Sequence, residues 1–274
     1  MFRTLYRGGL AMLLAVGLLA AVPADARAQN DGNVSFSTGI DFLPGSTYIW
    51  RGLSQETDPK LTTWPWWEAG ISLSDTVDVA FGGWHSLHTG SSGSDGPSGK
   101  IHYEEDFYAG VSFALPMDTG LGVTWTSYAS PNGSFETWHE LAFSFSVDNM
   151  YAPYVTIGQF LNEGQSGTLP KATYIELGVG PSWDLAGGAV NVGIPVLVGL
   201  SLNDFYTDAN GDNAGFGFFD VGVGITVPLR GMPASFGGWD FHANVDFQAY
   251  GDALELYNGD SSKVTGALGV SFSY

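Results

Sequence analysis

The chain has 274 residues, of which 28 are acidic and 9 basic, and it contains no cysteine. Its formal net charge of −19 argues against nucleic-acid binding, which needs basic patches, and instead attracts cations. The lack of cysteine excludes disulfides and thiolate metal sites. We therefore expect no cofactor, and stability has to come from the hydrogen-bonded fold alone.

The first recognisable element is an export signal. Two arginines precede an apolar run over residues 10–22, and an Ala-x-Ala cleavage motif follows at residues 26–28. Because the run is shorter than the ~20 residues that a spanning helix requires, a cleaved signal peptide over residues 1–28 is favoured over a membrane anchor. This segment carries three arginines and one aspartate, so its removal takes the net charge from −19 to −21 and leaves one domain over residues 29–274.

The mature chain alternates apolar with small or polar residues over twelve segments, the period-two pattern of two-faced strands. Helical periodicity is absent. In the last segment Val264, Leu268 and Phe272 share one face and Thr265 the other, and the chain ends on Tyr274. The twelve predicted strands span residues 33–54, 64–74, 77–88, 101–115, 120–129, 136–147, 152–161, 171–184, 189–203, 215–229, 239–251 and 263–274.

The first predicted strand contains an interruption at Pro44-Gly45, and proline cannot donate to a strand ladder. Two strands joined by a tight turn would give an odd total of thirteen. We therefore predict one bulged strand over residues 33–54 and twelve strands in all, with fourteen as the alternative.

Residues 46–55, Ser-Thr-Tyr-Ile-Trp-Arg-Gly-Leu-Ser-Gln, are the most distinctive segment. Arg51 is the only base of the first predicted strand, and an inward arginine would pair with interior carboxylates through charge-assisted hydrogen bonds. The segment resembles the Ser-x-Tyr-Val-(Phe/Trp)-Arg-Gly-(Ile/Val)-Ser-Gln signature near the start of the TorF-like family of outer-membrane porins. The resemblance implies an outer-membrane β-barrel with channel function. Pro44-Gly45 and the aromatic cluster at residues 64–67 depart from the signature.

The connections between the predicted strands alternate in length. Outer-membrane barrels have long outer loops, short periplasmic turns and an even strand number with both termini on the turn side, and the predicted strands fit this architecture. Residues 230–238 are the exception, a long connection where a short one is expected. The long connections are residues 55–63, 89–100, 130–135, 162–170, 204–214 and 252–262, and the short ones are 75–76, 116–119, 148–151 and 185–188.

A soluble β-sandwich also alternates polar and apolar residues, so it is the competing interpretation. The predicted strands commonly have 11–15 residues, whereas soluble strands average about 5–6. Aromatic residues gather near strand ends, which suggests rings at the two interfaces of a membrane. We therefore predict an all-β transmembrane antiparallel barrel in a bacterial outer membrane. These aromatic residues are Trp64, Trp66, Trp67, Trp84, Tyr128, Trp138, Tyr151, Tyr154, Trp183, Trp239, Tyr250 and Tyr274.

Strand alternation also assigns each side chain to lipid or to the barrel interior. Acids fall repeatedly on the interior face, so we predict a hydrated interior, because unpaired buried charge is very costly, and a preference for cations. Glu105 breaks the pattern by falling on the outward face. The predicted lining residues are Arg51, Glu68, Glu104, Asp106, Glu140, Glu176, Asp220, Asp240 and Asp246, with His102, His242, Asn191, Asn244 and Gln248 on the same face.

The main functional hypothesis is a porin-like channel for passive diffusion of small hydrophilic solutes or cations, in contact with outer-membrane lipid and lipopolysaccharide, and not an enzyme. The alternative is a non-conducting surface barrel whose acidic outer loops bind a partner or calcium. Asp208, Asn210 and Asp212 have the alternating oxygens of a calcium loop. The loop lacks the glycine and the acid that such a loop has at its sixth and twelfth positions, which favours a polar hairpin loop.

A third hypothesis is a barrel that hydrolyses membrane lipids. His85, His88 and His139 lie near strand ends, where an interfacial lipase would place its base. The chain contains neither a Gly-x-Ser-x-Gly elbow nor a His-Glu-x-x-His motif, so this hypothesis is disfavoured.

Overall fold

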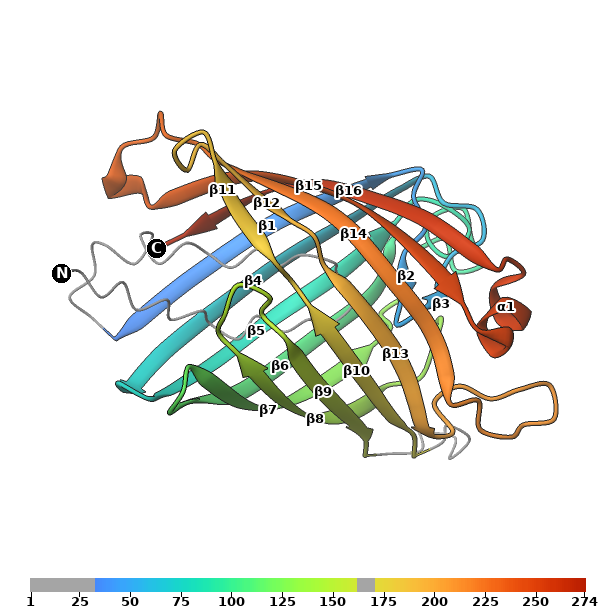
Figure 1. Cartoon of the computed structure of the whole chain (residues 1–274). Coiled ribbons are helices and arrows are strands. Elements are labelled where there is room, and N and C mark those ends of the chain that lie inside the picture. The colour runs from blue at the N-terminus through green and yellow to red at the C-terminus, as the bar shows by residue number, and fades with distance from the viewer. Residues whose placement is uncertain (1–32, 162–170) are drawn as a thin grey trace.

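The computed structural model describes residues 33–161 and 171–274 and shows a closed antiparallel barrel (Figure 1). The first strand, β1 (Val34–Pro44), pairs with both β4 (Leu61–Ser74) and the last strand, β16 (Ser262–Ser273). The sheet therefore closes on itself and leaves no unpaired edge. The predicted signal peptide lies outside the described residues.

Twelve barrel strands surround the interior in the described part of the chain, so the predicted twelve-strand barrel is confirmed rather than its fourteen-strand alternative. Two of the twelve are each split in two, at Pro181 and at Pro195, since proline has no N–H for the ladder. The split strands are β10 (Thr173–Val179) with β11 (Ser182–Leu185), and β12 (Val190–Gly193) with β13 (Val196–Asn203). The other strands are β5 (Val77–His88), β6 (His102–Leu115), β7 (Thr119–Ala129), β8 (Trp138–Val147), β9 (Tyr154–Phe160), β14 (Phe216–Pro228) and β15 (Gly238–Tyr250).

The predicted first strand over residues 33–54 is wrong in its second half. The wall strand ends at Pro44, and residues 45–60, here named the inward segment, leave the wall. They form a small separate sheet of two short strands, β2 (Ile49–Trp50) and β3 (Leu53–Ser54). The sequence pattern of alternation continued through this segment because a short hairpin has the same period as a wall strand.

The hairpin turn of the inward segment consists of two residues with left-handed backbone. Arg51 has φ 50° and Gly52 has φ 78°, the conformation of the tight hairpin turns that match strand twist. At the base of the segment, the N–H of Gly45 donates to the carbonyl of Lys60. The chain therefore returns to the wall beside the point where it left.

The two ends of the barrel differ. The start of β1, the C-terminus and the short turns lie at one end of Figure 1, and β2, β3 and the helix α1 (Asp252–Asn258) lie at the other, here named the loop end. The helix occupies a predicted loop and is too short for helical periodicity to reveal it. A 3-10 turn, η2 (Ala234–Phe236), occupies the unusually long connection at the turn end. None of the helices in the described ranges has the length and apolar character needed to cross a bilayer.

Large apolar side chains cover the outer face of the wall. The exposed fractions of Phe81, Phe107, Leu177 and Val245 are 44%, 47%, 44% and 58%. A continuous apolar face of this kind on a protein in water would be an interaction or aggregation surface, whereas hydrocarbon accommodates it. The outward face therefore fits a barrel that spans a membrane.

Candidate functional site

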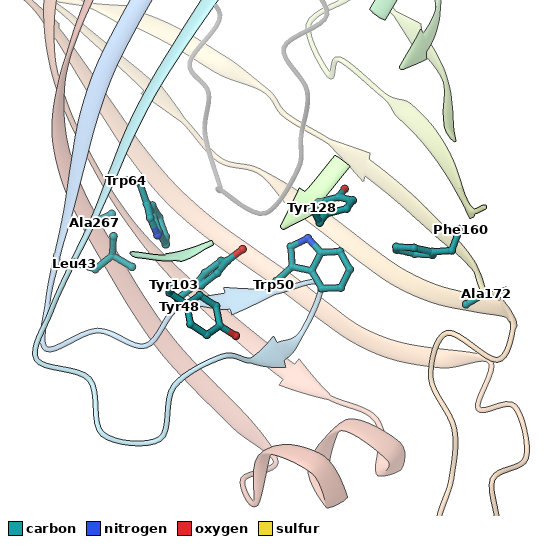
Figure 2. Packing of buried hydrophobic residues seen from close by; sticks show 9 residues of the cluster. All are labelled: Leu43, Tyr48, Trp50, Trp64, Tyr103, Tyr128, Phe160, Ala172 and Ala267. Carbon is teal, nitrogen blue, oxygen red and sulfur yellow. The ribbon is translucent and has the colours of Figure 1, made fainter. Parts of the chain in front are cut away.

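The inward segment fills the barrel interior at the loop end. Tyr48 is 0% and Trp50 4% exposed, although both lie on a connection between wall strands. Figure 2 shows them among Tyr103, Tyr128 and Phe160, which come from the wall. This packed aromatic cluster is the main feature that sequence analysis missed, since the interior was predicted to be hydrated throughout.

Tyr48 packs against one side of the wall. Its ring centroid lies 5.4 Å from that of Trp64 on β4, 5.5 Å from Trp84 on β5 and 6.4 Å from Tyr103 on β6. Tilted and edge-to-face pairs at these distances are favourable, at about 0.5–1.5 kcal/mol each beyond the area they bury. The inward segment is therefore fixed to three neighbouring strands.

Trp50 packs against the next part of the wall. Its ring lies 5.6 Å from Tyr128 on β7, 5.4 Å from Trp138 on β8 and 6.1 Å from Phe160 on β9. The interpretation of the strand-end aromatics as membrane-interface rings is therefore wrong for several of them, because the wall needs them as partners for the inward segment. The ones that pack against the inward segment are Trp64, Trp84, Tyr128 and Trp138.

Arg51 lies at the tip of the hairpin and is 6% exposed. Its Nη2 lies 2.9 Å from Oε1 of Glu140 on β8, and its guanidinium carbon is 4.2 Å from the centre of the Tyr174 ring on β10. Tyr128 donates its hydroxyl to the other oxygen of Glu140 at 3.0 Å. The predicted pairing of Arg51 with an interior carboxylate is thus present, and aromatic faces add cation–π attraction to it.

Hydrogen bonds hold the backbone of the inward segment from the remaining sides. Tyr206 donates its hydroxyl to the carbonyl of Arg51 at 2.8 Å. Asn258 on α1 donates to the carbonyl of Gly52 at 2.7 Å and accepts from the N–H of Ser54 at 2.9 Å. The segment is therefore bound around most of the barrel circumference and narrows the loop end.

All eight predicted interior acids lie at strand positions of the inward-facing parity, and six of them are buried, all except Glu68 and Asp240. Glu104, Glu140 and Glu176 lie near the loop end beside the inward segment, and the others lie deeper or toward the turn end. The alternation of side chains between the two faces of each strand is what predicted this placement. The eight are Glu68, Glu104, Asp106, Glu140, Glu176, Asp220, Asp240 and Asp246.

Tyrosine hydroxyl groups donate hydrogen bonds to some of these carboxylates. Glu176 accepts from Tyr154 at 2.8 Å and from Tyr174 at 2.7 Å, and Tyr108 donates to Glu68 at 3.0 Å. One oxygen of Asp106 and one of Asp246 have no hydrogen-bond partner among the described residues. Such oxygens need water or a cation, because an unpaired buried charge is costly.

Basic side chains are scarce inside the barrel. Among the described residues, Arg51 is the only buried lysine or arginine, and Glu140 compensates its charge. Of the other bases, four lie on loops or turns and one at the loop-end start of β16: Lys60, Lys100, Lys171 and Arg230 are the four, and Lys263 is the one on β16. The interior away from the hairpin therefore carries acids without matching bases.

His102 was predicted to face inward, and this is wrong. Ser86 pairs with Glu104 whereas Leu87 pairs with His102, so the ladder between β5 and β6 skips Tyr103 in a β-bulge. The extra residue turns Tyr103 inward and re-aims His102 to the outer face. A bulge changes the parity of a strand end without any mark in the alternating pattern.

A buried hydrogen-bond chain fixes the base of the inward segment. Ser86 Oγ lies 2.6 Å from Nε2 of His88, and Nδ1 of His88 lies 2.5 Å from Oγ of Ser92 and 3.4 Å from Oε2 of Glu56. This Ser-His-Glu order resembles a catalytic relay, but Ser86 and His88 are 0% exposed and the indole N–H of Trp64 donates to Ser86 Oγ at 2.9 Å. A nucleophile sealed in this way has no room for substrate, so the chain of bonds acts as an anchor.

The predicted calcium loop is held by one of its own acids. Oδ1 of Asp208 accepts from the backbone N–H of Asn210 at 2.8 Å and of Asp212 at 3.0 Å. These N–H groups, with that of Asp212 the stronger influence, hold the pKa of Asp208 below its usual range. The bonds explain the compact loop, and calcium binding there stays a prediction.

Comparison with solved structures shows which fold this is. An outer-membrane channel from Pseudomonas putida F1 is similar with a TM-score of 0.50 at 12% identity, over 92% of this chain and 99% of that chain. The fold is that of an outer-membrane β-barrel. The NanC porin is similar at 0.46 and 11% identity, over 87% and 98% of the two chains.

The outer membrane phospholipase A of Escherichia coli is also similar, at a TM-score of 0.46 and 8% identity over 88% of this chain and 92% of that chain. No family model and no curated protein matches the sequence. At these identities the likeness concerns the fold alone.

Proposed function

We propose that this protein is a channel of the bacterial outer membrane through which small hydrophilic solutes diffuse passively, with cations favoured. The observation that carries the proposal is the charge of the interior. The eight acids of the predicted lining lie at inward-facing strand positions, and the one buried arginine is already paired with Glu140. Acidic linings in narrow pores attract cations and repel anions.

The inward segment sets the narrowest part of this path. Its aromatic rings contact wall strands from β4 to β9, and its tip reaches Tyr174 on β10. Twelve strands enclose an interior intermediate between small filled barrels and 16–18-stranded porins, so a folded-in segment takes up much of the cross-section. We therefore expect small conductance and small solutes. The outer wall would contact lipid, and the loop end lipopolysaccharide.

The test is the ion preference of the purified, folded protein in planar bilayers with asymmetric KCl. We expect single channels whose reversal potential shows that potassium is favoured. The triple substitution Glu68→Gln, Asp220→Asn and Asp246→Asn should move the reversal potential toward zero. Asp220 and Asp246 lie on the neighbouring strands β14 and β15, so their substitution relieves repulsion. Glu68→Gln keeps an oxygen that can accept from Tyr108, so the triple variant should not unfold the barrel.

A matched control removes three acids from exposed loops at the loop end instead, by Asp204→Asn, Asp212→Asn and Asp260→Asn. At about 0.1 M salt the screening length is roughly 10 Å, so these outer charges should change the preference little. A chloride preference in the wild type, or equal effects of the two triple variants, would refute the proposed role of the interior acids.

The second candidate function is a closed barrel that does not conduct. The observation that favours it is the burial of the inward segment, in which Tyr48, Trp50 and Arg51 are each at most 6% exposed. The same bilayer measurement separates the two candidates, because a sealed barrel gives no steps of current at any voltage that the membrane tolerates.

A further inference from the structure

Three side chains with metal-binding atoms meet on the outer face of the wall, away from the interior. His85 lies on β5, and His102 and Glu105 lie on β6. One ligand atom from each lies within 4.8 Å of the others, and Nδ1 of His85 is 3.3 Å from Nε2 of His102. None of the three contributes to the interior described above.

The spacing of the two nitrogens matches a tetrahedral metal centre. Zinc binds imidazole nitrogen at about 2.0–2.1 Å, so two such ligands on one tetrahedral ion lie about 3.3–3.4 Å apart. The two imidazole rings are tilted by 55° with centroids 5.3 Å apart. They are therefore not stacked face to face, and both nitrogens can be directed at one point.

The wall holds the three ligands in place. His85 and Glu105 lie directly opposite each other on neighbouring strands, where side chains on one face come within about 5 Å. The bulge at Tyr103 brings His102 to the same outward face, opposite Leu87. The ligands of a site built on two paired strands lose little conformational entropy when they bind an ion.

The apolar residues around the cluster favour a bound cation. Phe81 and Phe107, 44% and 47% exposed, lie on the same outward face nearer the middle of the wall. The two imidazoles can share one hydrogen bond, but the carboxylate of Glu105 at the edge of such an apolar band is costly without a cation. One divalent ion uses a lone pair from each ligand and neutralises the charge of Glu105.

We propose that His85, His102 and Glu105 form a binding site for one divalent transition-metal ion, such as Zn²⁺, on the outer wall just below the loop end. Two imidazoles and one carboxylate are a known zinc ligand set that leaves a fourth position open for a water molecule. Calcium and magnesium prefer oxygen ligands, so this site discriminates against them.

The experiment is a calorimetric titration of Zn²⁺ into the folded full chain in detergent. We expect one saturable site per barrel that excess Ca²⁺ does not displace. His85→Gln and His102→Gln should each weaken zinc binding at least about tenfold, a loss that even changes outside the ligand set can cause. Cobalt supplies a second readout, because its visible absorption band reports tetrahedral coordination and should vanish in the same variants.

His139→Gln is the matched control, because His139 also faces outward near the loop end, on β8, where its ring stacks with Trp125. This variant should bind zinc as the wild type does. If a histidine variant fails to fold, Glu105→Gln, which preserves side-chain size, should weaken zinc binding in the same way. The proposal is overturned if the wild type shows no saturable zinc binding, if the ligand variants bind as tightly as the wild type, or if calcium competes.

Discussion

At the scale of single residues, the turn of the inward hairpin explains why Trp50-Arg51-Gly52-Leu53 occur together. The two-residue turn demands left-handed backbone at both central positions, which Gly52 adopts freely and Arg51 adopts at a cost. The cost is offset because only the turn position points the guanidinium at Glu140, 2.9 Å away. Breaking a buried pair of this kind by removing one partner costs about 3–5 kcal/mol.

Gly52 also has a steric reason to be glycine, which gives a prediction. A Cβ there would lie 2.5 Å from Leu254 and 2.8 Å from Phe218, and φ is +78°. Gly52→Ala should therefore add left-handed strain of about 1–2 kcal/mol to overpacking of about 1–3 kcal/mol. We expect the free energy for opening the inward segment to fall by about 2–5 kcal/mol, measured by hydrogen exchange of its backbone amides.

Gly45→Ala is the control for this prediction. Its φ is +67°, but nothing lies within 4 Å of the added Cβ, so it suffers the strain of about 1–2 kcal/mol alone. If both variants exchange equally fast, the contacts of Gly52 with Leu254 and Phe218 do not hold the hairpin in place.

At the scale of elements, the wall strands and the inward segment differ in how far sequence predicts them. The strand alternation gives the side of Glu68, Asp220 and Asp246 directly, because one register decides a whole strand. The hairpin is harder, since a turn that sends the chain inward is stabilised by partners as distant as Asn258. The only mark in the sequence of the point where the chain leaves the wall is Pro44-Gly45, which sequence analysis interprets as a bulge within one strand.

The bulge that moves His102 outward illustrates the same limit. Period-two alternation extends only as far as the ladder is regular, and a bulge is set by what the neighbouring side chains need. Tyr103 turns inward to stack on His88, with centroids 4.4 Å apart. His88 and Tyr103 are separated in sequence by the connection between β5 and β6, so the sequence around either residue does not predict their contact.

The inward segment can be removed as a unit, which gives a prediction at this scale. Pro44 and Leu61 are already paired across the ladder, so replacing residues 45–60 by Asn-Gly joins β1 to β4 through a two-residue hairpin. The wall keeps its hydrogen bonds, and the rings of Tyr48 and Trp50 leave the interior. We expect single-channel conductance in planar bilayers to rise severalfold.

The control is the same replacement in an exposed loop. Thr207 and Asn213 form an antiparallel bridge, so residues 208–212 can also be exchanged for Asn-Gly without disturbing the wall. This variant should conduct as the wild type does. A conductance unchanged by loss of residues 45–60 would mean that the inward segment does not limit the path.

At the scale of the whole molecule, closure determines both stability and asymmetry. With no cysteine in the chain, the pairing of β1 with β16 is what completes the ladder, and a closed ladder satisfies every wall strand on both sides. An even number of strands then returns the start of β1 and the end of β16 to one side. The inward segment, α1 and the long loops are left together at the other end.

This asymmetry predicts how the barrel is oriented in the cell. In outer-membrane barrels the longer loops face outward and the short turns face the periplasm. An epitope tag inserted at Gly211, in the exposed loop between β13 and β14, should therefore bind antibody on intact cells. A tag at Gly231, in the exposed connection between β14 and β15, should bind only after the outer membrane is permeabilised.

The two positions form a matched pair. Neither glycine has a neighbour within 4 Å of an added Cβ, and each lies in a connection longer than a tight turn, so both insertions should leave the wall intact. They differ only in the end of the barrel that carries them. The single strand β14 separates the two tags, so they must lie on opposite sides of the membrane if the barrel spans it. Antibody labelling of both tags on intact cells would therefore contradict the transmembrane arrangement.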